Sequence, residues 1–140
     1  MKNLISKRTV AIAAAFAALL VAAPAQAQVA EFDVPFPFLL QDKVLPAGQY
    51  VVRADAGSQT VALRLPSGTS MGLAMSVPVR RPASAPAVGS AVFQKYGKTY
   101  VLKTVWSRGV REGFQLPVSS AERELARAYT PAEVATVGAR

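Results

Sequence analysis

Side chains able to carry out catalysis are few, because the chain contains no histidine and no cysteine. Their absence removes the commonest general base, the commonest metal ligand and the thiolate nucleophile. A pair of carboxylates, as in glycosidases, is the remaining catalytic arrangement. The acids that could form one fall at predicted strand ends or turns, where carboxylates are normally solvated: Glu31, Asp33, Asp42, Asp55 and Glu112. We therefore expect no catalytic residue, and an enzyme ranks last among the functions considered.

Metal, cofactor and serine-nucleophile sites are not expected either. Calcium binding by Asp33, Asp42 and Asp55 would need several oxygens to converge on one point, and their spacing gives no such indication. Ser119 is followed three residues later by Glu122, which is the capping-box pattern of a helix N-terminus. That pattern explains the serine without a catalytic partner. The sequence thus predicts neither a metal nor a cofactor.

Basic and aromatic residues gather in one segment of the second half of the chain and form a candidate ligand surface. Such a surface could bind an anionic polymer of the cell envelope, and its aromatic rings could support a glycan. The alternative is structural, because aromatic residues pack in strands and lysines at strand edges prevent aggregation. We favour the structural interpretation and leave the other open. The candidate ligand-binding residues are Lys95, Lys98, Tyr100, Lys103, Trp106, Arg108 and Arg111.

The N-terminal segment has the pattern of a secretory signal peptide. Lys2, Lys7 and Arg8 precede an uncharged apolar run over 10–23, and small residues at Ala25 and Ala27 suit signal peptidase. The run is shorter than the roughly 20 apolar residues that span a bilayer. We therefore expect residues 1–27 to be removed, no transmembrane span to follow, and the protein to be periplasmic or extracellular.

The remaining chain is moderately basic. The leader takes three of the 16 basic residues and none of the 8 acidic ones, so the net charge falls from +8 to +5. Arg80-Arg81 is the only adjacent basic pair after the leader, and no tract resembles those that bind nucleic acid. The expected partner is therefore an anionic envelope polymer or a glycan, not nucleic acid.

An aromatic ribbon follows the leader and organises the rest of the chain. Its large apolar side chains recur at every second position, on one side of an extended segment: Phe32, Val34, Phe36 and Phe38. Pro35 and Pro37 lack the N–H that a central strand needs, so the ribbon is predicted to be an edge strand with its aromatic face inward. The alternative is that the 31–39 segment adds as a strand to a neighbouring subunit and builds a structural assembly.

Alternating patterns and turn residues predict the other elements. Strands are expected over 49–54, 60–65, 70–79, 91–96 and 99–106. An exposed loop is expected over 80–89, a polar connection over 107–117, a helix over 120–129 and a further helical turn to 137. The fold class is all-β, a single small sandwich or partly open barrel of about six antiparallel strands with a C-terminal helix. The β domain spans 28–118, and the helix and tail span 119–140.

The predicted core consists of the inward-facing side chains of these elements. Its members are Phe32, Val34, Phe36, Tyr50, Val52, Val61, Leu63, Leu73, Met75, Phe93, Leu102 and Leu125.

The combination of segments resembles a group of small exported bacterial proteins of unassigned function. They share an F-x-V-P-F-x-F opening, here 32–38, and an LPAGxY turn and strand, here 45–50. A closing E-R-E-L segment is present at 122–125, after the FQKYGKTYVLKTVW hairpin at 93–106. The likeness covers most of 32–128. It implies export and a compact β fold, and it supplies no activity and no site residues.

Overall fold

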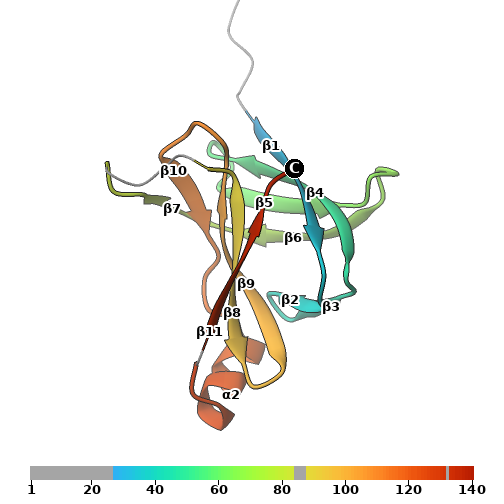
Figure 1. Cartoon of the computed structure of the whole chain (residues 1–140), viewed down its shortest axis with the longest axis vertical. Helices are drawn as coiled ribbons and strands as arrows, with labels where there is room; N and C mark the ends of the chain where they lie inside the picture. The colour runs from blue at the N-terminus through green and yellow to red at the C-terminus, as the bar shows by residue number, and fades with distance from the viewer. Residues whose placement is uncertain (1–26, 84–87, 132) are drawn as a thin grey trace, which may run out of the picture.

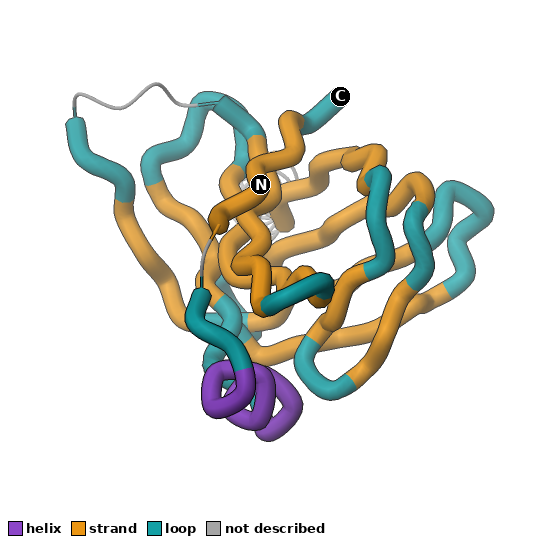
Figure 2. The backbone as a smooth tube through the Cα atoms, turned by 60° about the horizontal axis from the view of Figure 1, so that its bottom comes forward, coloured by secondary structure: helices purple, strands orange, loops and turns teal. Residues whose placement is uncertain are grey.

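The computed structural model describes residues 27–83, 88–131 and 133–140. Within these ranges the chain forms two open sheets of mainly antiparallel strands, with one helix, α2 (Ser120–Ala128), at one end (Figures 1 and 2). The predicted all-β class with a C-terminal helix is confirmed, and the sheets stay open rather than closing into a barrel. Nearly all of the predicted leader lies outside the described residues.

The first sheet has four strands in the order β1-β4-β5-β6. Their bounds are Ala27–Val34 for β1, Gly48–Asp55 for β4, Thr60–Arg64 for β5 and Ser70–Met75 for β6. The alternation in β4 and β5 puts Tyr50, Val52 and Leu63 in the core, as predicted. β1 lies at the edge of this sheet, which confirms the edge position of the ribbon's first half.

The two prolines of the ribbon divide it between the sheets. β1 ends at Val34, and β2 (Phe38–Leu40) begins after Pro37 and pairs with β3 (Lys43–Leu45) and in parallel with β9. Phe32, Val34 and Phe38 are buried, as expected for an inward aromatic face. Phe36, between the prolines, is half-buried and stacks on Tyr100 with 3.8 Å between ring centroids.

The second sheet has seven strands, and its main path runs β11-β8-β9-β10-β7. Their bounds are Val77–Arg80 for β7, Ser90–Tyr96 for β8, Thr99–Trp106 for β9, Glu112–Gln115 for β10 and Glu133–Gly138 for β11. The predicted hairpin of β8 and β9 is confirmed. Gly97 in its turn has φ 61°, a conformation that favours glycine.

Three strands of this sheet, β3, β10 and β11, were not predicted. β10 lies in the segment taken as a polar connection, and β11 replaces the predicted further helical turn. Phe114 in β10 is buried, but the strand is only four residues long. An alternation this short is not recognisable in the sequence. In β11 the half-buried Ala135 and Val137 alternate with exposed residues while the strand pairs with β8, and this tertiary pairing overrides the proline-based helix signal.

The segment predicted as one strand over 70–79 is divided between the sheets and faces the other way. Leu73 and Met75, predicted to be core, are 66% and 60% exposed, whereas Ala74 is buried. The reason is space: a Cβ on Gly72 would lie 2.5 Å from Leu40 Cδ2. Because Leu40 already fills that part of the interior, β6 must present its small residues inward.

A β-bulge in β9 changes which side chains face the core. The pairing passes from Val92 opposite Thr104 to Phe93 opposite Leu102, which leaves Lys103 as the extra residue. Leu102 and Val105 therefore both join the core. In a regular strand Leu102 and Trp106 would share one face. Beyond the bulge Val105 faces the core instead, and Trp106 lies on the outer face.

The helix covers a second, smaller apolar cluster. Leu39, Tyr96 and Val101 are buried there, and Ala121 and Leu125 of α2 pack against them. Leu125, predicted to be core, is half-buried. Figure 2 shows α2 beyond the end of the strand layers, so it covers that end without joining the main core.

Candidate functional site

Apart from Lys103, the predicted ligand-binding residues fall into two groups at opposite ends of β9. Lys95, Lys98 and Tyr100 lie at the hairpin turn, and Trp106 ends the strand that leads to Arg108 and Arg111. Since a strand rises about 3.3 Å per residue, the eight residues of β9 separate these ends by roughly 25 Å. The structure therefore does not bring the predicted surface together as one site.

At the hairpin end, Lys95 and Tyr100 are engaged with neighbours in the same chain. Lys95 Nζ lies 3.5 Å from Glu133 Oε2 and 5.5 Å from the ring centroid of Tyr100. The electrostatic influence of Tyr100, and then that of Glu133, raises the pKa of Lys95. Lys98 remains exposed in the turn. These contacts support the structural interpretation of this end of the hairpin.

Lys103, at the bulge, belongs to a buried polar network. Its Nζ lies 2.9 Å from Glu122 Oε2, and the Tyr96 hydroxyl donates to Glu122 Oε1 at 2.9 Å. Burial raises the pKa of Tyr96, and the hydrogen bond to Glu122 raises it further. Glu122 is 2% exposed. Lys103 therefore attaches α2 to β9 and is not part of the candidate ligand surface.

The predicted helix cap is confirmed in one of its two halves. Ser119 Oγ accepts a hydrogen bond from the Glu122 N–H at 3.2 Å and donates to the Gln41 carbonyl at 3.1 Å. The Glu122 side chain points to Tyr96 and Lys103 rather than back to the N-cap. Asp42 Oδ1 accepts from the Ala121 N–H at 2.9 Å, so Asp42 serves as an additional cap.

Trp106, at the other end of β9, lies between a strand and a guanidinium group. A Cβ on Gly113 would be 2.4 Å from Trp106 Cε3, so the indole lies directly against the backbone of β10. Arg81 Cζ is 4.6 Å from the ring centroid, in a cation–π contact. The ring is thus covered by the protein itself and is not an open platform for a sugar.

Arg81 contacts this indole, and three further arginines lie near Arg81 or Trp106 along the chain or across paired strands. We term these four residues the arginine cluster, Arg80, Arg81, Arg108 and Arg111. The Arg81 N–H donates to the Arg111 carbonyl at 2.9 Å, and Arg111 Nη1 donates to the Pro82 carbonyl at 2.8 Å. Arg81 Nη2 donates to the Val88 carbonyl at 2.6 Å. The backbone of Arg108 adjoins Gly89, next to Val88. Arg80 and Arg81 were not predicted as site residues, although their adjacency was the available signal.

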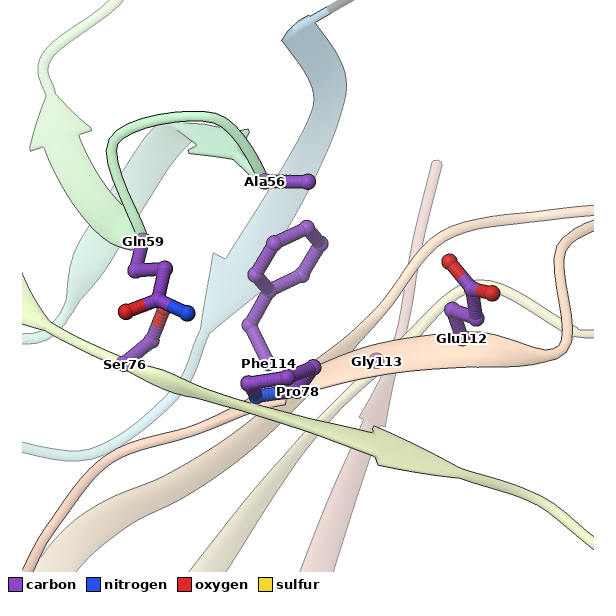
Figure 3. A pocket seen from close by; sticks show the side chains of 7 residues that line it. All are labelled: Ala56, Gln59, Ser76, Pro78, Glu112, Gly113 and Phe114. Carbon is purple, nitrogen blue, oxygen red and sulfur yellow. The ribbon is translucent and has the colours of Figure 1, made fainter.

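A small cavity of about 30 Å³ opens between the sheets near the same end (Figure 3). It is lined by the β4–β5 turn, by Ser76 between β6 and β7, and by Pro78, Glu112 and Phe114. A cavity of this volume has room for about two water molecules, so it cannot enclose a whole sugar or cofactor. A larger and more open groove of about 390 Å³ runs beside α2, but only an acid, Glu124, brings charge to its lining.

The acids considered for catalysis or calcium form no cluster of three or more in the described part of the chain. Glu31, Asp33, Asp42 and Glu112 are exposed, and Asp55 accepts a hydrogen bond from the Gly57 N–H at 2.9 Å. Within the described ranges, no group of three or more metal-ligating side chains is close enough to hold an ion.

The residues of the strand-addition alternative form part of the chain's own fold. β1 pairs along its length with β4, and Phe32, Val34 and Phe38 belong to the core, with Phe36 packed against it. Donating this segment to a neighbouring subunit would require β1 to leave β4.

Comparison with known proteins gives no match: no family model, no curated protein and no solved structure is significantly similar to the chain. Over residues 27–83, 88–131 and 133–140, no helix is both long and apolar enough to cross a bilayer.

Proposed function

We propose that the chain is a non-enzymatic exported binding module of the cell envelope, whose ligand surface is the arginine cluster around Trp106. The observation that carries the proposal is the placement of Arg81 over the indole while Arg111 is bonded to the adjoining loop. This arrangement holds cationic groups at one end of the sandwich. Guanidinium groups held in this way suit carboxylate, sulfate or phosphate groups, with which they form paired hydrogen bonds.

The geometry favours an anionic ligand over a neutral glycan. A neutral sugar normally stacks on an open aromatic face, but Gly113 and Arg81 already cover Trp106. Such a sugar would have to displace Arg81 and break a cation–π contact. An acidic polymer instead interacts with the cations directly, and exposed Arg80, Arg108 and Arg111 extend the positive surface.

The decisive experiment is titration with dextran sulfate and, as a neutral control of the same backbone, dextran. Trp106 is the only tryptophan in the chain, so its fluorescence reports directly on the site. We expect dextran sulfate to change the emission and dextran to have no effect. The affinity is expected to fall as salt is added, because exposed charges are screened.

Two charge-matched variants locate the binding surface. Arg111→Gln is expected to weaken dextran sulfate binding severalfold, because it removes one guanidinium of the cluster. Arg123→Gln removes the same charge from the exposed side of α2, at the other end of the molecule, and is expected to change the affinity little. If both variants lose the same affinity for dextran sulfate, the effect comes from the net charge of the protein, which would contradict the proposed site.

Export is tested independently of binding. The leader pattern leads us to propose that the protein recovered from the producing cell begins at Gln28. Intact mass or N-terminal sequencing checks this, and a chain that retains Lys2 would contradict export by this route.

A further inference from the structure

Ser76 places a buried hydroxyl group at the small cavity between the sheets. The residue is 5% exposed, and its Oγ has no hydrogen-bond partner among the described residues. Buried hydroxyl groups in native proteins are nearly always bonded, so one without an internal partner at a cavity is satisfied by water or by a ligand group that replaces it. The partner must itself be able to donate or accept a hydrogen bond.

Two further polar side chains and an aromatic ring line the same cavity. Figure 3 shows Gln59 and Ser76 together on one side of the Phe114 ring, with Glu112 on the other. Gln59 and Ser76 are also neighbours in the backbone, because the Ser76 N–H donates to the Gln59 carbonyl at 2.8 Å. Amide, hydroxyl and carboxylate groups around an aromatic ring form a set that hydrogen-bonds a sugar hydroxyl and packs against its C–H groups.

The size of the cavity limits which part of a ligand can enter. About 30 Å³ admits a group of one or two heavy atoms, such as a hydroxyl or hydroxymethyl group, and excludes a sugar ring. The rest of the ligand must therefore stay outside, across the opening of the cavity.

The cavity adjoins the arginine cluster through two paired strands. Glu112, which lines the cavity, pairs across β10 and β7 with Arg80 of the cluster. Arg81, the next residue, is bonded through its backbone to Arg111. Arg80 follows Pro78 by two residues and so lies on the cavity side of β7, whereas Arg81 and Trp106 lie on the other face. A polymer that contacts both faces at the end of β7 passes close to the opening.

We infer that the cavity binds a hydroxyl or hydroxymethyl group of one sugar unit while the arginine cluster holds the acid groups of the same polymer. The ligand is then an acidic polysaccharide rather than polyphosphate, which carries the charge but no sugar hydroxyl. This inference rests on the proposed anion-binding function and names the ligand class of that site.

The test compares polygalacturonate with polyphosphate, both followed by Trp106 fluorescence. Ser76→Ala is expected to weaken polygalacturonate binding about fivefold, as for the loss of one uncharged hydrogen bond, and to leave polyphosphate binding unchanged. Ala56→Leu, on the exposed turn at the cavity, is expected to have the same selective effect by blocking entry. Ala47→Leu, on another exposed turn, is the matched control and is expected to change neither affinity.

Each outcome has a distinct meaning. If neither polymer binds, the proposed function itself is overturned. If both bind through Arg111 but Ser76→Ala and Ala56→Leu leave the polygalacturonate affinity unchanged, only the sugar inference is overturned. Equal weakening of both polymers by Ser76→Ala also overturns it, because the effect would then be on the fold or the charge. Circular dichroism of each variant confirms that the β structure is retained.

Discussion

Glu122 of α2 and Lys103 of β9 form an ion pair at 2.9 Å, with side-chain exposures of 2% and 18%. The β-bulge directs Lys103 toward the helix, and the N-cap at Ser119 fixes the start of the helix so that Glu122 reaches it. Ala121 and Leu125 pack on the small apolar cluster, and bonds to Gln41 and Asp42 hold the start of the helix. Through Lys103 and Tyr96, Glu122 attaches α2 to both strands of the β8–β9 hairpin.

Removing this acid is expected to destabilise the protein. Glu122→Ala leaves Lys103 without its partner in a mostly buried position, which costs about 3 kcal/mol, near the low end for a buried pair because Lys103 keeps some exposure. Glu124→Ala removes an acid from an exposed position of the same helix and should cost under about 0.5 kcal/mol. Urea unfolding followed by circular dichroism measures both. Similar midpoints for the two variants would show that the ion pair contributes no net stability.

Stability is expected to decline as the solution becomes alkaline. Burial raises the pKa of Tyr50 and of Tyr96, and Tyr100 and Glu133 raise the pKa of Lys95. In each case the folded state keeps a proton that the unfolded chain releases at lower pH. The stabilisation is thus complete below the unfolded value, about 10 for tyrosine, and is lost as the pH rises through the raised folded values.

Tyr96→Phe provides the test of that pH dependence. The variant removes one of the contributing protons, so its unfolding free energy should fall less steeply than that of the parent between about pH 9 and about pH 11. Denaturant melts at a series of pH values measure both slopes. Parallel slopes would mean that Tyr96 titrates alike in the folded and unfolded states.

Leu63 and Leu73 provide a direct test of which face of each strand is buried. Leu63 is 1% exposed and Leu73 is 66% exposed, although the alternating pattern predicted both as core. Leu63→Ala is expected to cost about 2–5 kcal/mol, and Leu73→Ala under about 0.5 kcal/mol. Denaturant unfolding distinguishes them, and comparable losses would restore the original assignment of β6.

This pair shows how far the sequence alone defines the fold. Strands β4, β5, β8 and β9 alternate over several residues, so their positions could be predicted from the side-chain period. The inward face of β6 could not, because it depends on Leu40 occupying the space beside Gly72. The bulge at Lys103 was equally hidden, since it results from the pairing of β9 with β8 and reverses the face of every later residue.

The sequence likewise predicted only part of the candidate site, because contacts made by strand pairing do not show in local patterns. Trp106 at the end of β9 and the two arginines after it were identified by composition. Arg80 and Arg81 join them only because β7 pairs with β10. Lys103 was assigned to the ligand surface because its partner, Glu122, comes from the helix and looked like half of a capping box. Ser76 gave no signal, since a buried hydroxyl group is defined by its surroundings.

Substitution of Gly113 tests whether its contact with Trp106 organises the arginine cluster. A Cβ at this position would lie 2.4 to 2.9 Å from three atoms of the indole, so Gly113→Ala forces the ring away from β10. The overpacking is expected to cost about 1–3 kcal/mol. The emission of Trp106 should shift, because the displaced ring loses its cover from β10 and its contact with Arg81.

The matched variant Gly68→Ala adds a Cβ where nothing lies within 4 Å, although its φ of 94° makes any side chain strained there. It therefore controls for lost stability without touching the indole, and only Gly113→Ala should weaken dextran sulfate binding. If Gly113→Ala binds normally with an unshifted emission, the indole is not held between β10 and Arg81, and the arginine cluster does not depend on it.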